Sequence, residues 1–299
     1  MEPVALRPLN FGEVLDTSFN LFKRNFKAVV LVSGAIMIPL SLLGAAAAAG
    51  LAPSDLSALD DPNADVEDIL GLFGGLLGAI GLGSLLQIVG SILVQAATTR
   101  IYAESYRGGS MSAGDALRHG LGRLPGMLGL TLLTTIGSFI GIILCIAPGV
   151  WLYAAWGLAP AALIAEPTSP IKALGRSFNL VKGNWWRVFG LLLLAAVLVA
   201  IISGTVTAPL QFGATFGAGF AENPAFVLSG TFVALNTLVT GLVTAVTLPF
   251  TAAVVVAIYY DLRVRKEGYD LERLIADLGA APDAPAPPTA NPSDPFGLG

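Results

Sequence analysis

Residues Val188 to Leu210 read VFGLLLLAAVLVAIISGTVTAPL, a stretch of 23 residues without a charged side chain. A helix needs about 20 apolar residues to cross the roughly 30 Å hydrocarbon core of a bilayer. It must also pair every backbone N–H and C=O group within itself, because the core contains no water. The stretch therefore predicts a transmembrane helix.

The composition of the whole chain agrees with this prediction. Of 299 residues, 55% are hydrophobic and only 12% are charged, which is more apolar surface than a soluble domain can bury. The single cysteine, Cys145, and the single histidine, His119, exclude an intramolecular disulfide and a multi-histidine metal site. We expect an all-α, polytopic membrane helix bundle that holds no metal or cofactor.

Six apolar runs predict about six transmembrane helices. The third and fourth runs are separated only by Pro148 and Gly149, a pair that favours a tight hairpin turn. The last run is longer than one crossing requires and contains Pro249, so one kinked helix and two shorter segments remain alternatives. We assign residues 1–278 to the membrane domain and expect a disordered, Pro-rich cytoplasmic tail over residues 279–299. The predicted spans are residues 28–50, 69–97, 127–147, 150–165, 188–210 and 226–260.

The basic residues alternate strictly with these runs. Four Lys or Arg residues precede the first run, four lie between the second and third, four between the fourth and fifth, and four follow the sixth, which accounts for all 16. The other connecting segments carry none. Because Lys and Arg accumulate in cytoplasmic loops, this pattern predicts that both termini are cytoplasmic.

A basic, amphipathic segment precedes the first run. Between Phe11 and Phe26, apolar residues recur every three or four positions, as in a helix that lies in the membrane interface. The passage Ser18 to Leu21 reappears as Ser177 to Leu180, at an offset of 159, and residues 114–124 form a weaker third copy. We expect two or three interfacial helices on the cytoplasmic side and three repeated units. The alternative is that membrane insertion favours similar entry sequences.

Three passages carry a resemblance to a known family. They are LRPLNFGEVLD at residues 6–16, ALGRSFNLVKGNWW at residues 173–186 and YYDLRVRKEGYD at residues 259–270. With them the chain resembles the glycerophosphoryl diester phosphodiesterase membrane-domain family of bacterial membrane proteins. The resemblance implies a multi-pass protein of the bacterial inner (cell) membrane with an unsettled role. The enzymatic barrel of that family uses paired histidines and carboxylates, so its activity is not expected here.

The interfacial pattern and the family passages select sixteen candidate residues for contact with the membrane interface or a partner. The mixed charges near residue 261 fit either a local salt-bridge network or a partner-docking surface. The candidates are Phe19, Asn20, Lys23, Arg24, Asn25, Arg176, Ser177, Asn179, Lys182, Asn184, Trp185, Trp186, Asp261, Arg263, Arg265 and Lys266.

The predicted spans contain no Asp, Glu, Lys, Arg or His, which argues against coupling to protons through a buried acid. Their polar residues either line a cavity or form hydrogen bonds between helices. We also expect His119 to be solvated at the interface, and Gly71, Gly75, Ala79 and Gly83 to form a packing seam. The polar residues are Gln87, Gln95, Thr131, Thr134, Thr135, Ser138, Asn236, Thr237, Thr240 and Thr244.

These observations favour a non-enzymatic integral membrane protein. Its expected role is to organise lipid or to assist or regulate a membrane enzyme or transporter. Its expected partners are the bilayer, anionic headgroups and a membrane protein, without nucleic acid. The alternative is a transporter or channel for a small or amphiphilic solute, which the repeats and the prolines near helix breaks favour.

Overall fold

The computed structural model describes residues 8–51, 65–220 and 229–268, and all regular structure in these residues is helical. This confirms the all-α prediction. The helices are α1 (Phe11–Arg24), α2 (Phe26–Leu51), α3 (Val66–Tyr106), α4 (Ala113–Leu144), α5 (Ile146–Trp156), α6 (Ala159–Ala165), α7 (Pro170–Val181), α8 (Trp185–Phe220) and α9 (Gly230–Glu267).

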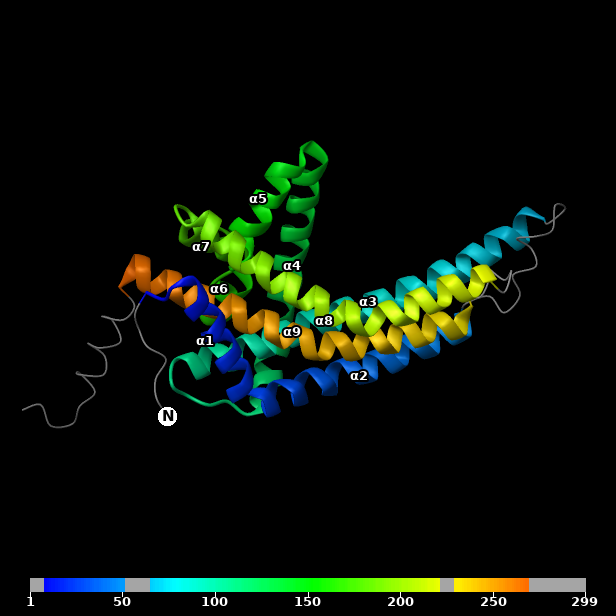
Figure 1. Cartoon of the computed structure of the whole chain (residues 1–299), viewed down its shortest axis with the longest axis horizontal. Coiled ribbons are helices and arrows are strands. Elements are labelled where there is room, and N and C mark those ends of the chain that lie inside the picture. Colours follow the sequence, from blue (N-terminus) through cyan, green and yellow to red (C-terminus); the bar gives the residue numbers. More distant parts are fainter. Residues whose placement is uncertain (1–7, 52–64, 221–228, 269–299) are drawn as a thin grey trace, which may run out of the picture.

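Six segments of the described residues are long and apolar enough to cross a membrane. Five of them are single helices, and the sixth joins α5 and α6. Helices α2, α3, α8 and α9 lie side by side and form a long bundle (Figure 1). The six segments are Phe26–Leu51, Val66–Tyr106, Ala113–Leu144, Ile146–Ala165, Trp185–Phe216 and Gly230–Glu267.

Helix α9 forms the centre of the molecule. It packs against α2, α3, α8 and α1, and its residues from Ala252 to Leu262 are all buried. It is one continuous helix with Pro249 inside it, so within the described residues the last apolar run is a single segment. Residues 226–228 of the predicted span lie outside the described part. Proline is tolerated here because neighbouring helices surround the interrupted turn.

Helices α4 and α5 form a hairpin that projects away from the long bundle (Figure 1). Its turn is at Cys145, whose extended backbone separates the two helices. The prediction of a turn at Pro148 and Gly149 is therefore wrong. Both residues lie in the first turn of α5, where a proline is tolerated because its missing N–H has no helical partner in any case.

Small residues let the helices approach closely. A Cβ atom on Gly141 would lie 2.9 Å from the Cα of Gly149, so this pair fixes the hairpin near its turn. In the long bundle, a Cβ on Gly44 would lie 3.4 Å from the Cα of Gly83. The predicted seam on α3 is only partly used: Ala79 and Gly83 are buried, but nothing lies within 4 Å of a Cβ placed on Gly71.

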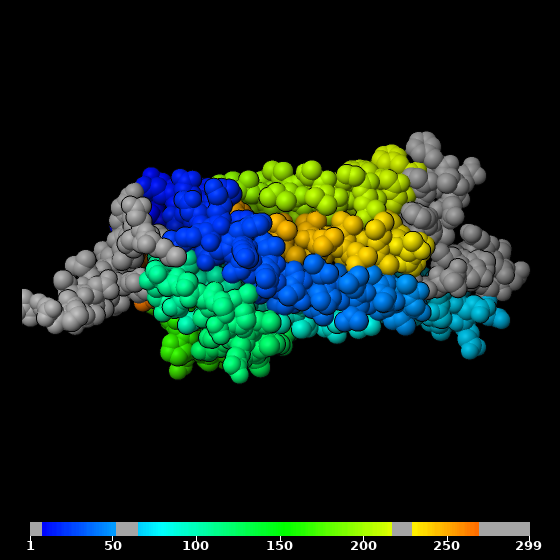
Figure 2. All heavy atoms as spheres, turned by 90° about the horizontal axis from the view of Figure 1, so that it is seen from below, coloured from blue at the N-terminus to red at the C-terminus, as the bar shows by residue number. Residues whose placement is uncertain are grey.

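One end of the long bundle gathers the charged residues. Helices α1 and α7, the last turns of α3 and α9 and the first turns of α4 and α8 meet there (Figures 1 and 2). Every Lys and Arg of the described residues belongs to these segments, to the first turn of α2, or to the residue directly after α3 or α7, which is Arg107 or Lys182. We call this the basic end. The other end includes Asp65, Glu67 and Asp68 at the start of α3.

Candidate functional site

Helices α1 and α7 are built alike at the basic end. Each begins after a polar residue, Asn10 or Ser169, and those two positions differ by 159. Each also buries a serine at the same register, Ser18 or Ser177, with both side chains fully buried. The helices that follow, α2 and α8, start at Phe26 and Trp185, which again differ by 159.

The third amphipathic segment, residues 114–124, shares part of this arrangement. Helix α4 starts after Ser112 and buries Ala116 and Gly120, at the same spacing from the helix start as the buried residues of α1 and α7. Unlike α1 and α7, it continues through Pro125 into the following apolar segment without a turn. Three amphipathic segments at the basic end thus bury residues at the same positions counted from the helix start.

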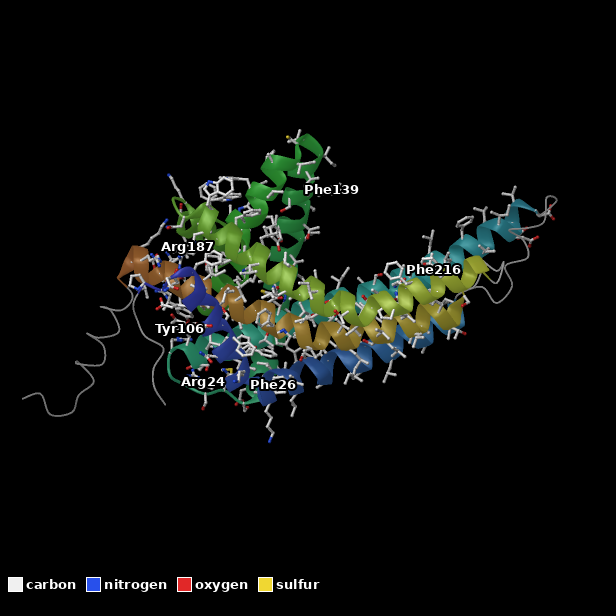
Figure 3. All side chains as sticks on the ribbon, in the orientation of Figure 1. Arg24, Phe26, Tyr106, Phe139, Arg187 and Phe216 are labelled. Carbon is white, nitrogen blue, oxygen red and sulfur yellow. The ribbon has the colours of Figure 1, made fainter. Side chains whose placement is uncertain are left out.

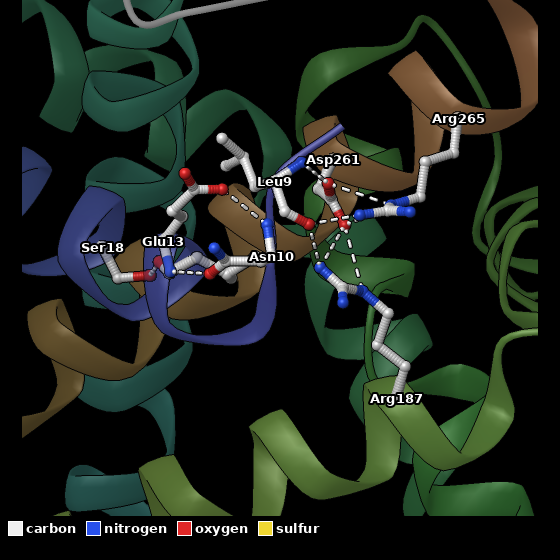
Figure 4. A network of polar contacts seen from close by, with 8 residues as sticks. Leu9, Asn10, Glu13, Ser18, Arg187, Asp261 and Arg265 are labelled. Atoms are coloured by element: carbon white, nitrogen blue, oxygen red, sulfur yellow. Dashed lines mark hydrogen bonds and ion pairs between the residues drawn. The ribbon is translucent and has the colours of Figure 1, made fainter. Parts of the chain in front are cut away.

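Asp261 is the centre of the first polar junction (Figure 4). Its fully buried carboxylate accepts hydrogen bonds from the backbone N–H of Leu9 at 2.8 Å, from Arg187 at 3.1 Å and from Arg265 at 3.0 Å. The carbonyl of Leu9 accepts from the same two arginines, at 2.6 Å from Arg187. A buried carboxylate is tolerated when charged donors surround it in this way. The junction ties the segment before α1 to α8 and α9.

Arg176 on α7 is the centre of the second junction. It donates to Glu166 at 3.0 Å and holds both carboxylate oxygens of Glu267, one of them at 2.8 Å. Tyr259 donates its hydroxyl to Glu166, and Arg263 donates to Glu267 at 3.1 Å. The hydrogen bonds to Glu267 raise the pKa of Arg176 above its ordinary value, so its guanidinium stays charged.

Two further contacts complete the basic end. Lys266 donates from Nζ to the carbonyls of Asn179, at 2.8 Å, and Lys182, which are left free where α7 ends. Arg24 and Asn25 both reach the hydroxyl of Ser105, at 2.7 and 2.9 Å, and so bind the turn between α1 and α2 to the end of α3.

The remaining predicted residues divide into two groups. Ser177 is structural, because its hydroxyl donates to the carbonyl of Ala155 at 2.7 Å and accepts from the N–H of Leu158 at 3.2 Å. Phe19 and Trp186 point outward, with 53% and 79% of their surface exposed. The exposed group comprises Phe19, Asn20, Lys23 and Trp186, whereas Asn184 and Trp185 are half-buried.

Sequence reasoning missed Leu9, Arg187, Ser105 and Tyr259 as members of these junctions. Arg187 had a signal, because an acid at the end of an apolar run requires a cationic partner. Nothing in the sequence pointed to the Leu9 backbone or to Ser105. Of the two alternatives for the mixed charges near residue 261, the structure contains the salt-bridge network.

Two cavities are lined by the polar residues of the apolar runs. The first, which we call the hairpin cavity, lies between the hairpin and α3, α8 and α9 and has a volume of about 530 Å³. The second, the bundle cavity, has about 460 Å³ between α3 and α9. Polar linings are Gln95, Thr131, Thr134, Thr135, Ser138 and Thr251 in the hairpin cavity, and Ser84, Gln87, Asn236, Thr237 and Thr240 in the bundle cavity.

Both expectations for these polar residues are met in part. Nine of the ten predicted residues line a cavity, and Thr244 lines neither of the two. Gln87 also forms an interhelical hydrogen bond, from Nε2 to the hydroxyl of Ser41 at 2.9 Å, while its Oε1 is buried without a partner. Thr134 donates to its own helix, at 2.9 Å to the carbonyl of Thr131, which leaves its oxygen free to accept.

The chemistry of both cavities is restricted to neutral contacts. Neither is lined by Asp, Glu, Lys, Arg or His. In the described part of the chain no three His, Cys, Asp or Glu side chains gather where they could hold a metal ion. These cavities can offer hydroxyl and amide groups next to apolar walls.

Comparison with known proteins gives one match. Residues 109–262 match a family described as a domain of unknown function, DUF7847, which covers just over half of the chain. The chain belongs to this family. The DUF7847 region begins before α4 and ends after Asp261. It contains the hairpin, the part of α9 that lines both cavities, and the Arg187–Asp261 pair. Helices α1 and α2 lie outside it. No curated protein and no solved structure matches the chain.

Proposed function

We propose that this protein is a non-enzymatic integral membrane protein that holds a lipid between its hairpin and its long bundle. The hairpin cavity supports this function best. Its walls are apolar, as at Phe139 and Leu192, and a row of uncharged polar groups runs along α4. Such a surface matches a molecule that has both acyl chains and a polar, uncharged part.

The surroundings of the hairpin support the same proposal. Outside the cavity, α4 and α5 expose large apolar side chains, such as Leu132 and Ile143 on α4 and Ile146 on α5 (Figure 3). These faces suit contact with acyl chains. The hairpin projects away from the long bundle, so a lipid can enter the cavity between them laterally from the bilayer.

We place the basic end at the cytoplasmic face of a bacterial inner membrane. The described Lys and Arg residues all gather there, and positive charge accumulates on the cytoplasmic side. The matching starts of α1 and α7 support a repeated unit, in which an interfacial helix leads into two apolar segments. The resemblance to the phosphodiesterase membrane-domain family supports the same location.

Lipid retention tests the proposed function. The full-length protein is extracted in mild detergent, and its bound lipid is measured by native mass spectrometry. Ala196→Trp fills the hairpin cavity from its rim, and Ala200→Trp places the same side chain elsewhere on the exposed face of α8. We expect the wild type and Ala200→Trp to retain lipid and Ala196→Trp to lose it. Equal retention by all three proteins would overturn the proposal.

A transporter remains the second candidate, because the two cavities lie in series along α3. Gln87 and Gln95 are eight residues apart, so the cavities are offset by about 12 Å along the helix. The absence of ionisable side chains in both linings argues against proton coupling. Purified protein in liposomes that moved a small or amphiphilic solute, and lost this flux in Ala196→Trp, would favour this function. A role as accessory to a membrane enzyme or transporter predicts instead a stoichiometric partner after extraction.

A further inference from the structure

The end of α3 and the start of α4 carry basic side chains whose donors are not all used. Nε of Arg100 and Nε2 of His119 are both buried and have no hydrogen-bond partner. A buried donor without a partner is costly, by roughly 1–3 kcal/mol in folded proteins. Polar groups of this kind call for a ligand or water.

The charge around these two donors is not balanced. His119 lies close enough to Arg100 and Arg123 to feel both of their charges. Glu104 on α3 already contacts Arg100 at 3.4 Å and Arg107 at 3.1 Å, and Asp115 on α4 accepts a hydrogen bond from the hydroxyl of Ser112. No ion pair of Arg123 is present in the described part of the chain. An anion between the basic groups would relieve their mutual repulsion.

Close packing of the two helices holds the cluster together. A Cβ atom on Gly120 would lie 3.3 Å from the Cβ and the backbone nitrogen of Ala97. The absence of a side chain at Gly120 thus lets α4 approach α3 just beside His119 and three residues before Arg100. His119 and Arg123 are four residues apart and lie on one face of α4.

We propose that Arg100, His119 and Arg123 form a binding site for the phosphate group of an anionic lipid. Guanidinium groups hold phosphate oxygens through two parallel N–H donors, and the imidazole Nε2 adds a further contact. The site differs from the hairpin cavity, whose lining is uncharged. The proposal rests on the membrane location that we propose for the basic end.

Binding to the full-length protein in mild detergent tests the site. The probes are a short-chain phosphatidic acid, the phosphatidylcholine with the same chains, and inorganic phosphate, each titrated while thermal unfolding is followed. We expect phosphatidic acid to raise the melting temperature and phosphatidylcholine to have little effect. Inorganic phosphate distinguishes a lipid headgroup from free phosphate as the ligand. An equal response to it would assign the site to free phosphate and overturn the lipid part of the proposal.

Charge-matched variants localise the response. Arg100→Gln and Arg123→Gln should each weaken phosphatidic acid binding about tenfold or more, because each removes charged hydrogen bonds to the phosphate. Arg118→Gln is the control, since Arg118 is an exposed neighbour with the same charge, and it should bind like the wild type. Equal weakening in all three variants would show a diffuse basic surface and overturn the site.

Two further variants keep the test decisive. Arg123→Lys retains the charge without the planar fork of donors, so it should bind between the wild type and Arg123→Gln. If Arg100→Gln fails to fold, the half-buried Arg123 alone decides the outcome. Ala200→Trp, which lies outside both sites, should leave phosphatidic acid binding unchanged. A protein that retains lipid in the hairpin cavity but gives no response to phosphatidic acid would overturn this inference and leave the proposed function intact.

Discussion

The carboxylate of Asp261 accepts a hydrogen bond from the backbone N–H of Leu9 at 2.8 Å, across 252 positions of the chain. The same carboxylate also accepts hydrogen bonds from Arg187 and Arg265, so helix α9 holds the first described residues in place. This junction therefore ties the first described residues to α8 and α9.

Asp261→Ala should strongly destabilise the protein. It leaves Arg187, Arg265 and the Leu9 amide in a largely buried site without their acceptor, and breaking a buried ion pair costs about 3–5 kcal/mol. Thermal unfolding in detergent measures the loss. Glu104→Ala is the control, because its ion pairs with Arg100 and Arg107 are partly exposed and should contribute about 1 kcal/mol or less. Equal losses in the two variants would contradict the central role of Asp261.

Ser177→Ala should cost more stability than Ser18→Ala. Both serines are fully buried at the same register of their helices. Ser177 accepts from the N–H of Leu158 and donates to Ala155, so its removal leaves a buried amide without a partner, at about 1–3 kcal/mol. The hydroxyl of Ser18 only donates back to Val14 in its own helix. Chemical or thermal unfolding of the two variants compares these costs, and a greater loss in Ser18→Ala would refute the difference.

Gly241→Ala should disrupt the packing of α9 against α2. The added Cβ would lie 1.7 Å from the hydroxyl of Ser41 and 3.0 Å from Nε2 of Gln87, so the helices must separate. Ser41→Gly in the same chain should restore part of the stability. Gly204→Ala on α8, where nothing lies within 4 Å of a Cβ, is the control and should be neutral or slightly stabilising. The melting temperatures of the four proteins test this prediction.

The tip of the hairpin should end inside the bilayer. Leu144 and Ile146 on either side of Cys145 are 77% and 72% exposed, and no charged residue lies near the turn. Helix α5 alone has 11 residues, about 16 Å, and reaches the length of a crossing only together with α6. A membrane-impermeant maleimide should therefore label Cys145 from neither side of intact membranes, and should label it after detergent is added.

Two engineered cysteines in a Cys145→Ser protein calibrate the labelling experiment. Lys23→Cys at the basic end should react from the cytoplasmic side and Asp65→Cys from the opposite side. Labelling of Cys145 from the side of Asp65 would show that α4 crosses the membrane completely.

The sequence predicted much of this fold, because hydropathy and charge are local properties. Runs of apolar residues located the long helices, and the distribution of Lys and Arg anticipated that the basic segments meet at one end. The turn at Cys145 was missed because Pro148 and Gly149 are equally compatible with the first turn of a helix. The divergence of the hairpin from the bundle has no local signal.

Only residues whose charge called for a partner could be predicted as members of the candidate site. Asp261 and Arg265 stood out as charges next to an apolar run, and they do belong to the junction. The partners Leu9 and Ser105 contribute backbone or hydroxyl groups that many residues could supply, so no pattern distinguishes them. The two cavities depend on how far the helices separate, which composition does not determine.

The hydrogen bond between Leu9 and Asp261 also bears on how the protein is made. Leu9 is synthesised 252 residues before its acceptor Asp261, whereas Arg187 is synthesised 74 residues before it, so both donors lack that carboxylate until α9 is made. A chain that stops before α9 would leave those donors unpaired at the membrane surface. Quality-control proteases could recognise a chain without α9 by the unpaired donors of Leu9 and Arg187.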